Sequence, residues 1–416
     1  MPDRERSAVP PALKLSTPPG AFASKARPVS EVQPVPAVVA KCGSPNALAA
    51  IRSLGRAGIP VVALDYRRNE LGLTSRFARP RLCPDPVNHE ERFVRSLVEL
   101  AEDLGVEAPI FPTNDELLNA IGRNESELRS RYLCPFPRWD VLGPIQSKRF
   151  QLQRAAELGI PHPRTAEEPT AAFGFPALVK PSDPAPFQRA FGVHAFRCAS
   201  MADLEVGFER ALPHGPLVQE LIPGGDDHLY TFGAYMTEEG EALGVFSGRK
   251  LRQIPPTVGT CRVGEAVWVD EVVEHGLTYL RGLGYHGLAQ VEFKRDPRDG
   301  AYKLMEINPR LWLWHGLAAA CGVDFPLIAY RDLIGDTVEP VRSDGHRKRW
   351  AATLVAGSWP ALTQPPYVDA IFARDDLRPG FVHAGRVAGA TVPGKGIRKS
   401  LRLSRQALDA LRGGRV

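Results

Sequence analysis

The sequence predicts an α/β protein of two or three domains, and three observations carry that prediction. The chain has 416 residues, which is too long for one ordinary hydrophobic core. Near its start, two short apolar runs flank a stretch of helical periodicity, which is the pattern of a β-α-β unit. Between residues 290 and 310, two alternating stretches flank a turn, the pattern of an antiparallel hairpin that carries two glutamates.

The N-terminal part is predicted to be Rossmann-like. Residues 35–41 and 59–64 read as two strands, and residues 47–57 read as the helix between them. Strands joined in this way lie parallel in a sheet. The unit has no Gly-x-Gly-x-x-Gly motif, so the sequence does not support a dinucleotide site. Residues 113–116 follow another predicted strand, at 108–112, and either cap a helix or contact a substrate beyond the strand end.

The later hairpin gathers acidic side chains on one face. Its predicted strands cover residues 291–294 and 302–307. In an antiparallel pair the strand ends far from the turn lie side by side, so we expect Glu292 near Glu306, with Asn308 on the same face. Two carboxylates and an amide oxygen suit magnesium, with phosphate completing the coordination. The alternative is a surface hairpin whose glutamates are solvated.

Arg310 follows the second strand as a fixed cation that can hold a phosphate or a carboxylate in two-point contact. The full pattern, Glu-Phe-Lys at residues 292–294 and Met-Glu-Ile-Asn-Pro-Arg at residues 305–310, resembles the ATP-grasp superfamily. It is similar to the carboxylate–amine ligases of the D-aspartate ligase and carbamoyl-phosphate synthase type. The resemblance implies a Rossmann-like pre-ATP-grasp domain followed by an α+β ATP-grasp domain. It also implies ATP and Mg²⁺ (or Mn²⁺) as cofactors, with the metal on Glu292, Glu306 and Asn308.

Two lysines match phosphate-binding positions of that family. Lys148 opens a helix that is followed by Gly-Ile-Pro-x-Pro, and Lys180 ends an apolar strand at residues 175–180. The resemblance assigns both to ATP phosphates, and it assigns Lys180 and Arg310 to catalysis. The alternatives are a solvated helix lysine and a surface lysine at a strand end. For Lys180 the surface alternative is weaker, because buried strands seldom carry an unpaired lysine.

The segment after Lys180 departs from the family pattern. Relatives place a glycine-rich loop over the phosphates there, whereas residues 182–192 contain one glycine, Gly192. Backbone amides cradle phosphate closely only where no side chain intrudes. We therefore expect a lid that works differently, which affects turnover more than nucleotide binding.

Residues 217–227 resemble the family's hinge, a strand followed by Pro-Gly-Gly and two aspartates. By position, Glu220 and Ile222 frame adenine, and Asp227 (or Asp226) faces the ribose hydroxyls. The alternative is a strand and tight turn with solvated aspartates. Residues 247–260 form a polar loop, which is either a surface loop or one that faces the transferred phosphate and an anionic substrate.

The charge distribution and the cysteine content argue against some kinds of partner and site. The net charge is +5. Residues 1–36 contribute +2 and residues 394–416 contribute +6, which leaves −3 for the rest of the chain. The folded body therefore gives no electrostatic case for a nucleic-acid partner. Six scattered cysteines argue against a zinc site or a disulfide framework and fit a reducing cytosol. Prolines interrupt any signal-peptide core, so we expect a cytoplasmic protein.

These patterns divide the chain into four parts. We expect a disordered leader over residues 1–35, the pre-ATP-grasp domain over 36–140 and the ATP-grasp domain over 141–340. A C-terminal extension over 341–416 completes the chain. It holds a basic amphipathic helix at 396–411, which is either a docked terminal helix or a contact with a membrane surface or a protein. The sequence does not specify the oligomeric state.

The function implied by the resemblance is that of an ATP- and magnesium-dependent, ADP-forming carboxylate–amine ligase. Such an enzyme phosphorylates a small-molecule carboxylate and joins it to an amine substrate, forming an amide or peptide bond. Phosphoryl transfer depends on positioning and charge, so the lack of a nucleophile motif is no objection. Two alternatives stay open: a bicarbonate-using carboxylase or carbamoyl-phosphate type of enzyme, and a non-catalytic ATP-binding module.

Overall fold

The computed structural model describes residues 34–182, 184–254, 259–343, 345, 347–352 and 367–391. Residues 1–33 of the leader predicted over 1–35, and the basic helix predicted at 396–411, lie outside these residues. Those two expectations therefore remain predictions.

The N-terminal part forms a five-stranded parallel sheet in the order β3-β2-β1-β4-β5. Its strands are β1 (Ala37–Ala40), β2 (Val61–Asp65), β3 (Ala78–Leu82), β4 (Ala108–Pro112) and β5 (Tyr132–Leu133). Val38 of β1 pairs with Val62 on one side and with Ile110 on the other. Both β1 and β2 are buried along their whole length, as expected for strands covered on two faces. The predicted Rossmann-like start is confirmed.

Five helices accompany this sheet: α1 (Pro45–Arg56), α2 (Glu90–Leu104), α3 (Asp115–Arg123), α4 (Glu125–Leu128) and α5 (Trp139–Ile145). Helix α1 begins with a proline, whose missing N–H costs nothing in the first turn. Helix α3 begins after Asn114, whose side chain accepts a hydrogen bond from the Leu117 N–H at 3.1 Å. The capping alternative for residues 113–116 is thus realised, and Asp115, the first residue of the helix, contacts Arg310 of the candidate site described below.

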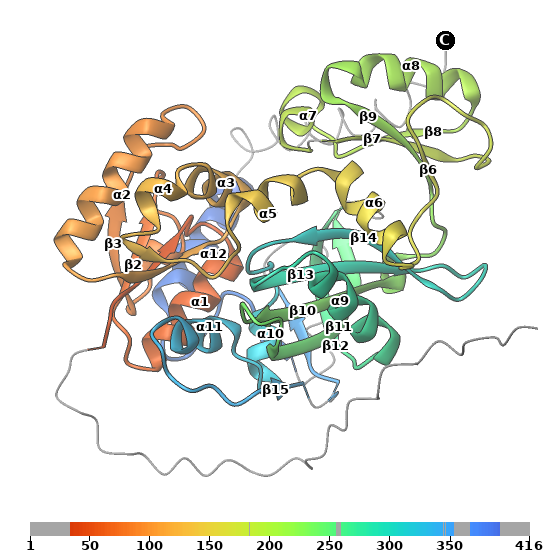
Figure 1. The fold of residues 1–416 in the computed structure, drawn as a ribbon. Helices are drawn as coiled ribbons and strands as arrows, with labels where there is room; N and C mark the ends of the chain where they lie inside the picture. Colours follow the sequence, from red (N-terminus) through yellow and green to blue (C-terminus); the bar gives the residue numbers. More distant parts are fainter. Residues whose placement is uncertain are drawn as a thin grey trace, which may run out of the picture. The chain divides into compact units, whose positions relative to one another are not determined.

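The second sheet has eight strands, in the order β14-β13-β10-β11-β12-β16-β17, with β15 paired to β11 (Figure 1). Its strands are β10 (Leu229–Met236), β11 (Ala242–Ile254), β12 (Thr260–Ala266), β13 (Gly287–Arg295), β14 (Tyr302–Asn308), β15 (Val341–Arg342), β16 (Arg349–Ala351) and β17 (Tyr367–Asp369). The strands from β10 to β14 pair antiparallel. Strands β15–β17 come from beyond residue 340, so the predicted boundary there cuts a continuous sheet.

The two faces of this sheet belong to two different cores. Phe232 and Ala234 of β10 face a core shared with α9 (Asp270–Gly282) and α6 (Lys148–Glu157). Tyr235 faces a core shared with α1, α10 (Gly316–Ala320) and α11 (Phe325–Leu333). Gly233 is needed on that second face, because a Cβ there would lie 2.2 Å from the Trp312 ring. The large sheet and the N-terminal domain therefore share one hydrophobic core.

The third sheet has four strands, in the order β6-β9-β7-β8. Its strands are β6 (Thr165–Ala166), β7 (Ala177–Pro181), β8 (Phe196–Cys198) and β9 (Pro216–Glu220), covered by α7 (Pro184–Phe191) and α8 (Met201–Ala211) (Figure 1). Helix α7 occupies the place of the family's glycine-rich loop. Phe187 of α7 is fully buried and packs on Phe191 and Phe196 at ring distances of 4.7 and 5.0 Å. The segment that lacks the glycine-rich pattern therefore contains a helix, α7, which packs into the core of the four-stranded sheet.

After β17 the chain forms α12 (Arg378–Thr391), which the sequence patterns did not predict. Asp376, just before it, is buried and accepts hydrogen bonds from Arg52 Nε at 2.9 Å and Ser75 Oγ at 2.8 Å. Arg52 is buried as well, and removing either partner would leave an uncompensated buried charge. The start of α12 is thereby tied to the N-terminal domain. None of the described helices is both long and apolar enough to cross a membrane.

Candidate active site

The site is built on the pairing of β13 and β14. Glu292 lies opposite Glu306, and Gln290 lies opposite Asn308. A bulge follows, because Phe293 pairs with Leu304 and leaves Met305 without a partner on β13. The pairing of the two glutamates, with Asn308 on their face, confirms the predicted hairpin.

Strand periodicity explains why the polar side chains gather. Val291 and Phe293 are fully buried in the core under α9. Gln290 and Glu292 alternate with them and therefore point to the other face. Across the bulge, Glu306 and Asn308 share that face, while Ile307 turns to the core. The acidic face is thus the reverse side of a well-packed hydrophobic surface.

Glu306 is paired with Lys148 of α6. The Lys148 Nζ donates to Glu306 Oε2 at 2.7 Å. The ammonium of Lys148 holds the pKa of Glu306 well below its usual range, and Lys250 and Lys180 act in the same direction. Glu306 is therefore an anion surrounded by three cations, at a place where the family resemblance puts a metal ion and phosphates.

Glu292 is paired with Lys250 of β11. The Lys250 Nζ donates to Glu292 Oε2 at 2.8 Å, and both side chains are largely buried. Gln290 fixes the other carboxylate oxygen, because its Nε2 donates to Glu292 Oε1 at 3.0 Å. The same amide contacts Thr231 Oγ1 at 3.0 Å and accepts from Asn308 Nδ2 at 3.2 Å. Burial lowers the pKa of Lys250, but Glu292 more than compensates, so the net shift is upward.

The donor set fits a magnesium ion shared with phosphate. Glu292, Glu306 and Asn308 present carboxylate and amide oxygens from adjacent strands, which are the ligands that Mg²⁺ prefers. Among the described residues, no group of three or more His, Cys, Asp or Glu side chains is placed to hold a metal ion by itself. A metal here would therefore need oxygens from a bound phosphate, as is usual for Mg²⁺ at nucleotide sites. In the structure, lysine ammonium groups supply the compensating positive charge.

Arg310 connects this face to the N-terminal domain. Its Nε and Nη2 donate to the two carboxylate oxygens of Asp115 at 2.6 and 2.9 Å, and Nη2 also contacts Asn308 Oδ1 at 3.3 Å. Burial lowers the pKa of Arg310, but Asp115 more than offsets that and the net shift is upward. The guanidinium is thus a permanent cation, held in a fixed orientation beside the carboxylate pair.

Lys180 lies near the end of β7 and lines the same cavity. Burial lowers its pKa to about 8, with the nearby Lys148 adding to the effect. Its ammonium makes no hydrogen bond or ion pair in the described structure. The Glu306 carboxylate attracts this ammonium but makes no direct contact with it, and a half-buried lysine without a directly bonded carboxylate is unusual. It is a group whose charge a bound phosphate would satisfy.

One cavity of about 340 Å³ brings these groups together. Six of the nine predicted site residues line it: Lys148, Lys180, Glu292, Glu306, Asn308 and Arg310. Lys250, Gln290, Gln253 and His194 line it as well. Gln290 could have been predicted as a site residue, because it lies two residues before Glu292 on one strand and therefore shares its face. His194 has no comparable sequence signal, because it depends on how α7 and β8 fold.

The three predicted hinge residues, Glu220, Ile222 and Asp227, do not line that cavity. The buried Glu220 carboxylate accepts from the Arg164 N–H at 2.9 Å and from Arg298 Nη2 at 3.0 Å. The carbonyl of Ile222 accepts from the buried Lys294 Nζ at 2.8 Å. Asp227 is exposed. The predicted adenine and ribose roles of these residues stay predictions, and the Glu220 side chain is committed to structural ion pairs.

Comparison with known proteins supports the resemblance. No family model matches the chain. A D-aspartate ligase from Enterococcus faecium is 24% identical over 258 residues, which cover 56% of this chain and 59% of that enzyme. The chain thus matches about three fifths of that relative's length.

Solved structures agree with the sequence comparison. One similar structure is the biotin carboxylase domain of a 2-oxoglutarate carboxylase from Hydrogenobacter thermophilus, in complex with MgADP, ADP and bicarbonate. It superposes on this chain with a TM-score of 0.58 at 19% sequence identity. The match covers 75% of this chain and 72% of that one. An L-amino acid ligase from Bacillus licheniformis gives 0.57 at 15% identity, covering 74% and 76%. These likenesses show that the chain has the fold of the ATP-grasp enzymes, as its motifs predicted.

Proposed function

We propose that this protein is an ATP- and magnesium-dependent ligase that activates a carboxylate as an acyl phosphate and joins it to an amine. The observation that carries the proposal is the cavity itself. Two carboxylates from the β13–β14 pair and a fixed arginine just after it meet there a lysine, Lys180, that comes from β7 of the four-stranded sheet. That combination binds a metal–triphosphate and still offers a cation for the group being transferred.

The comparisons support the reaction class. The relative matched by sequence is a D-aspartate ligase, and one structural neighbour is an L-amino acid ligase. Another neighbour is a carboxylase domain in complex with MgADP. Because the sequence match covers 59% of the ligase, the activity, the small-molecule carboxylate and amine substrates, and a cytoplasmic location are proposals for this chain.

Each residue has a part in the proposed reaction. Glu292, Glu306 and Asn308 would hold Mg²⁺, which neutralises phosphate charge when it is bound. Lys148 and Lys180 bind phosphate oxygens of ATP. The substrate carboxylate oxygen then attacks the γ-phosphorus; the bond to the β-phosphate oxygen breaks, and ADP leaves.

The acyl phosphate then reacts with the amine. Nitrogen forms a bond to the carbonyl carbon, the carbon–oxygen bond to phosphate breaks, and the nitrogen loses a proton. Arg310 holds the phosphoryl oxygens through both steps, and Asp115 positions Arg310 through its two-point contact. The rate gain comes mainly from fixed charges that need no rearrangement.

Two other functions have specific observations in their favour. The carboxylase neighbour in complex with bicarbonate favours a bicarbonate-using reaction on the same scaffold. Helix α7, which replaces a glycine-rich phosphate loop, favours a module that binds ATP without turning it over. The binding module is less favoured because nucleotide binding alone does not need Arg310 and its partner Asp115. The carboxylase is less favoured because the relative matched by sequence is a D-aspartate ligase.

The decisive experiment is ADP release from MgATP with a panel of carboxylates, each tested with and without a panel of amines. A ligase releases ADP when both substrates are present and yields an amide detectable by mass spectrometry. ADP release that depends on bicarbonate would favour the carboxylase. ATP binding by calorimetry without ADP release under any combination would favour the binding module.

A further inference from the structure

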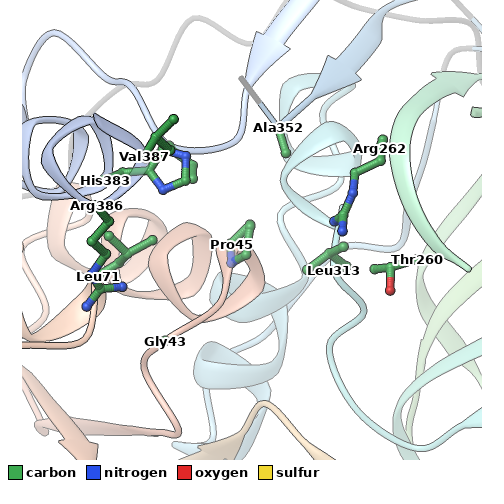
Figure 2. A pocket seen from close by; sticks show the side chains of 11 residues that line it. Gly43, Pro45, Leu71, Thr260, Arg262, Leu313, Ala352, His383, Arg386 and Val387 are labelled. Carbon is green, nitrogen blue, oxygen red and sulfur yellow. The ribbon is translucent and has the colours of Figure 1, made fainter. Parts of the chain in front are cut away.

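A second cavity has a volume of about 420 Å³ and is shown with its lining residues in Figure 2. Its volume falls within the range of small-molecule sites, about 300–1,000 Å³. Figure 2 shows Arg262, Thr260 and Leu313 on one side and His383, Arg386 and Val387 of α12 on the other. Pro45, Leu71, Ala352 and Ile371 complete mostly apolar walls.

The two cavities share a border. Thr260 and Leu313 line both of them. Along β12, Cys261 lines the catalytic cavity and its neighbour Arg262 lines the second one. Strand β12 therefore separates the two cavities, and Thr260 and Leu313 mark the place where they adjoin.

A β-bulge aims Arg262 into the second cavity. Cys261 pairs with Gln253 and Val263 pairs with Arg252, so Arg262 has no partner on β11. Bulges bend a strand and re-aim one side chain, and they are frequent beside active sites. The orientation of Arg262 is thus a property of the strand pairing.

Among the described residues, no carboxylate contacts the guanidinium of Arg262. Its Nε is buried without any hydrogen-bond partner, and the side chain forms no ion pair with the described residues. Arg386, the other cation of the cavity, is already bound to Glu70 and to the carbonyl of Asn69. An unpaired buried donor is costly unless a ligand satisfies it. The planar fork of arginine fits a carboxylate in two-point contact.

We propose that the second cavity binds the amine substrate as an apolar amino acid, whose own carboxylate pairs with Arg262. The apolar walls take the side chain, and the amino group faces Thr260 and Leu313, toward the catalytic cavity. The assignment of this molecule as the amine substrate rests on the proposed ligase function.

The bound carboxylate is the unreactive one. The carboxylate to be phosphorylated must lie with Lys180, Arg310 and the paired glutamates, all of which line the first cavity. Arg262 does not line that cavity. It can therefore recognise a second carboxylate, and keep that group away from the phosphates.

The test measures binding without nucleotide, so that its outcome does not depend on ADP release. Calorimetry compares leucine, as both enantiomers, with the matching leucinamide, which lacks the carboxylate. We expect one enantiomer of leucine to bind the wild-type protein about ten- to a hundredfold more tightly than its amide. Arg262→Gln should weaken leucine to the level of the amide, while MgADP affinity is unchanged.

Two further variants serve as a negative control and as an independent test of the second cavity. Arg197→Gln removes an exposed arginine from β8 and should leave leucine binding unchanged. Val387→Trp fills the cavity from α12, where the side chain is half-buried, and should weaken leucine binding by a similar factor to Arg262→Gln. If Arg262→Gln also loses MgADP binding, Val387→Trp decides the question instead.

Several outcomes would overturn the site: equal binding of leucine and leucinamide, unchanged leucine affinity in both cavity variants, or no binding of either leucine enantiomer. The role in ligation is tested separately by ADP release. Loss of amide product in Arg262→Gln with acid-dependent ADP release retained supports the amine assignment. Loss of ADP release together with leucine binding would make the bound molecule the acid that is activated, and would overturn that assignment.

Discussion

The strand pair β13–β14 and the hinge at residues 217–227 both carry glutamates beside lysines or arginines, but the surroundings of these glutamates differ. Glu292 and Glu306 each accept a hydrogen bond from one lysine and line the wall of a cavity. Glu220 in the hinge is buried, and Arg164, Arg298 and Lys303 surround its carboxylate. The strand pair is thus arranged for a ligand, whereas the hinge carboxylate is satisfied by the protein.

The difference lies in which partners can leave. Lys148 and Lys250 are single ammonium groups, each on one carboxylate, and a metal ion can replace either of them. Arg298 holds Glu220 and Asp296 at once, and Lys303 holds the same two carboxylates. Exchanging one cation in that network leaves buried charges uncompensated, which is expensive. A carboxylate's neighbours, more than its type, therefore distinguish a site residue from a structural one.

The strongest way to break this comparison is Glu306→Gln. The change keeps the shape of the side chain but removes a charged ligand for the metal, so ADP formation should fall by at least about a hundredfold. The fold should persist, because Glu306 is 37% exposed and faces the cavity. ADP release and circular dichroism together check this expectation.

A matched change, Glu274→Gln, alters an exposed glutamate on α9 and should leave turnover unaffected. Wild-type ADP formation in Glu306→Gln would remove this glutamate from the metal site. It would also leave the strand pair no different in kind from the hinge.

The variant Arg310→Ala tests whether Arg310 stabilises the transferred phosphoryl group or only binds ATP. If Arg310 acts mainly on the transition state, turnover should fall about a hundredfold while ATP affinity falls less than about tenfold. Arg310→Lys should recover only part of the loss, because a lysine cannot make the two-point contact. Calorimetry beside ADP release separates the two effects, and equal losses in affinity and turnover would make Arg310 a ground-state anchor.

Glu220→Gln tests the hinge. Loss of the buried negative charge leaves Arg298 and Lys303 with one anion fewer, so the free energy of unfolding should fall by about 1–3 kcal/mol. Turnover at saturating ATP should be largely retained. Urea unfolding measures the first quantity and ADP release the second; the opposite pattern, a stable protein with no turnover, would move Glu220 into the catalytic site.

The smallest expected effect is the pH dependence of ATP affinity through Lys180. Burial lowers the pKa of Lys180 to about 8, so the free protein loses this positive charge as the pH rises through 8. ATP affinity should be highest below that pH and should fall above it by up to about tenfold per pH unit. Lys180→Arg stays charged, and its affinity should be flat over the same range. An identical pH slope in both proteins would contradict the role of Lys180.

The sequence by itself determined the features that depend on short stretches of chain. The parallel start follows from two apolar runs around a helix, and the strand pair follows from period-two alternation on both sides of a turn. That alternation was enough to place Glu292 opposite Glu306, because one face had to be apolar. Lys148 and Lys180 came from resemblance alone, and the structure brings both to the same cavity.

The tertiary structure decided what depends on segments distant in sequence. Arg310 meets Asp115 across 195 positions, and Glu220 meets Arg298 across 78. No local pattern encodes such distances, because they arise only when separate sheets pack. Helix α12 closes the second cavity for the same reason, through the buried contact between Asp376 and Arg52. Local alternation fixes which face a side chain occupies, and packing alone fixes which charge it meets there.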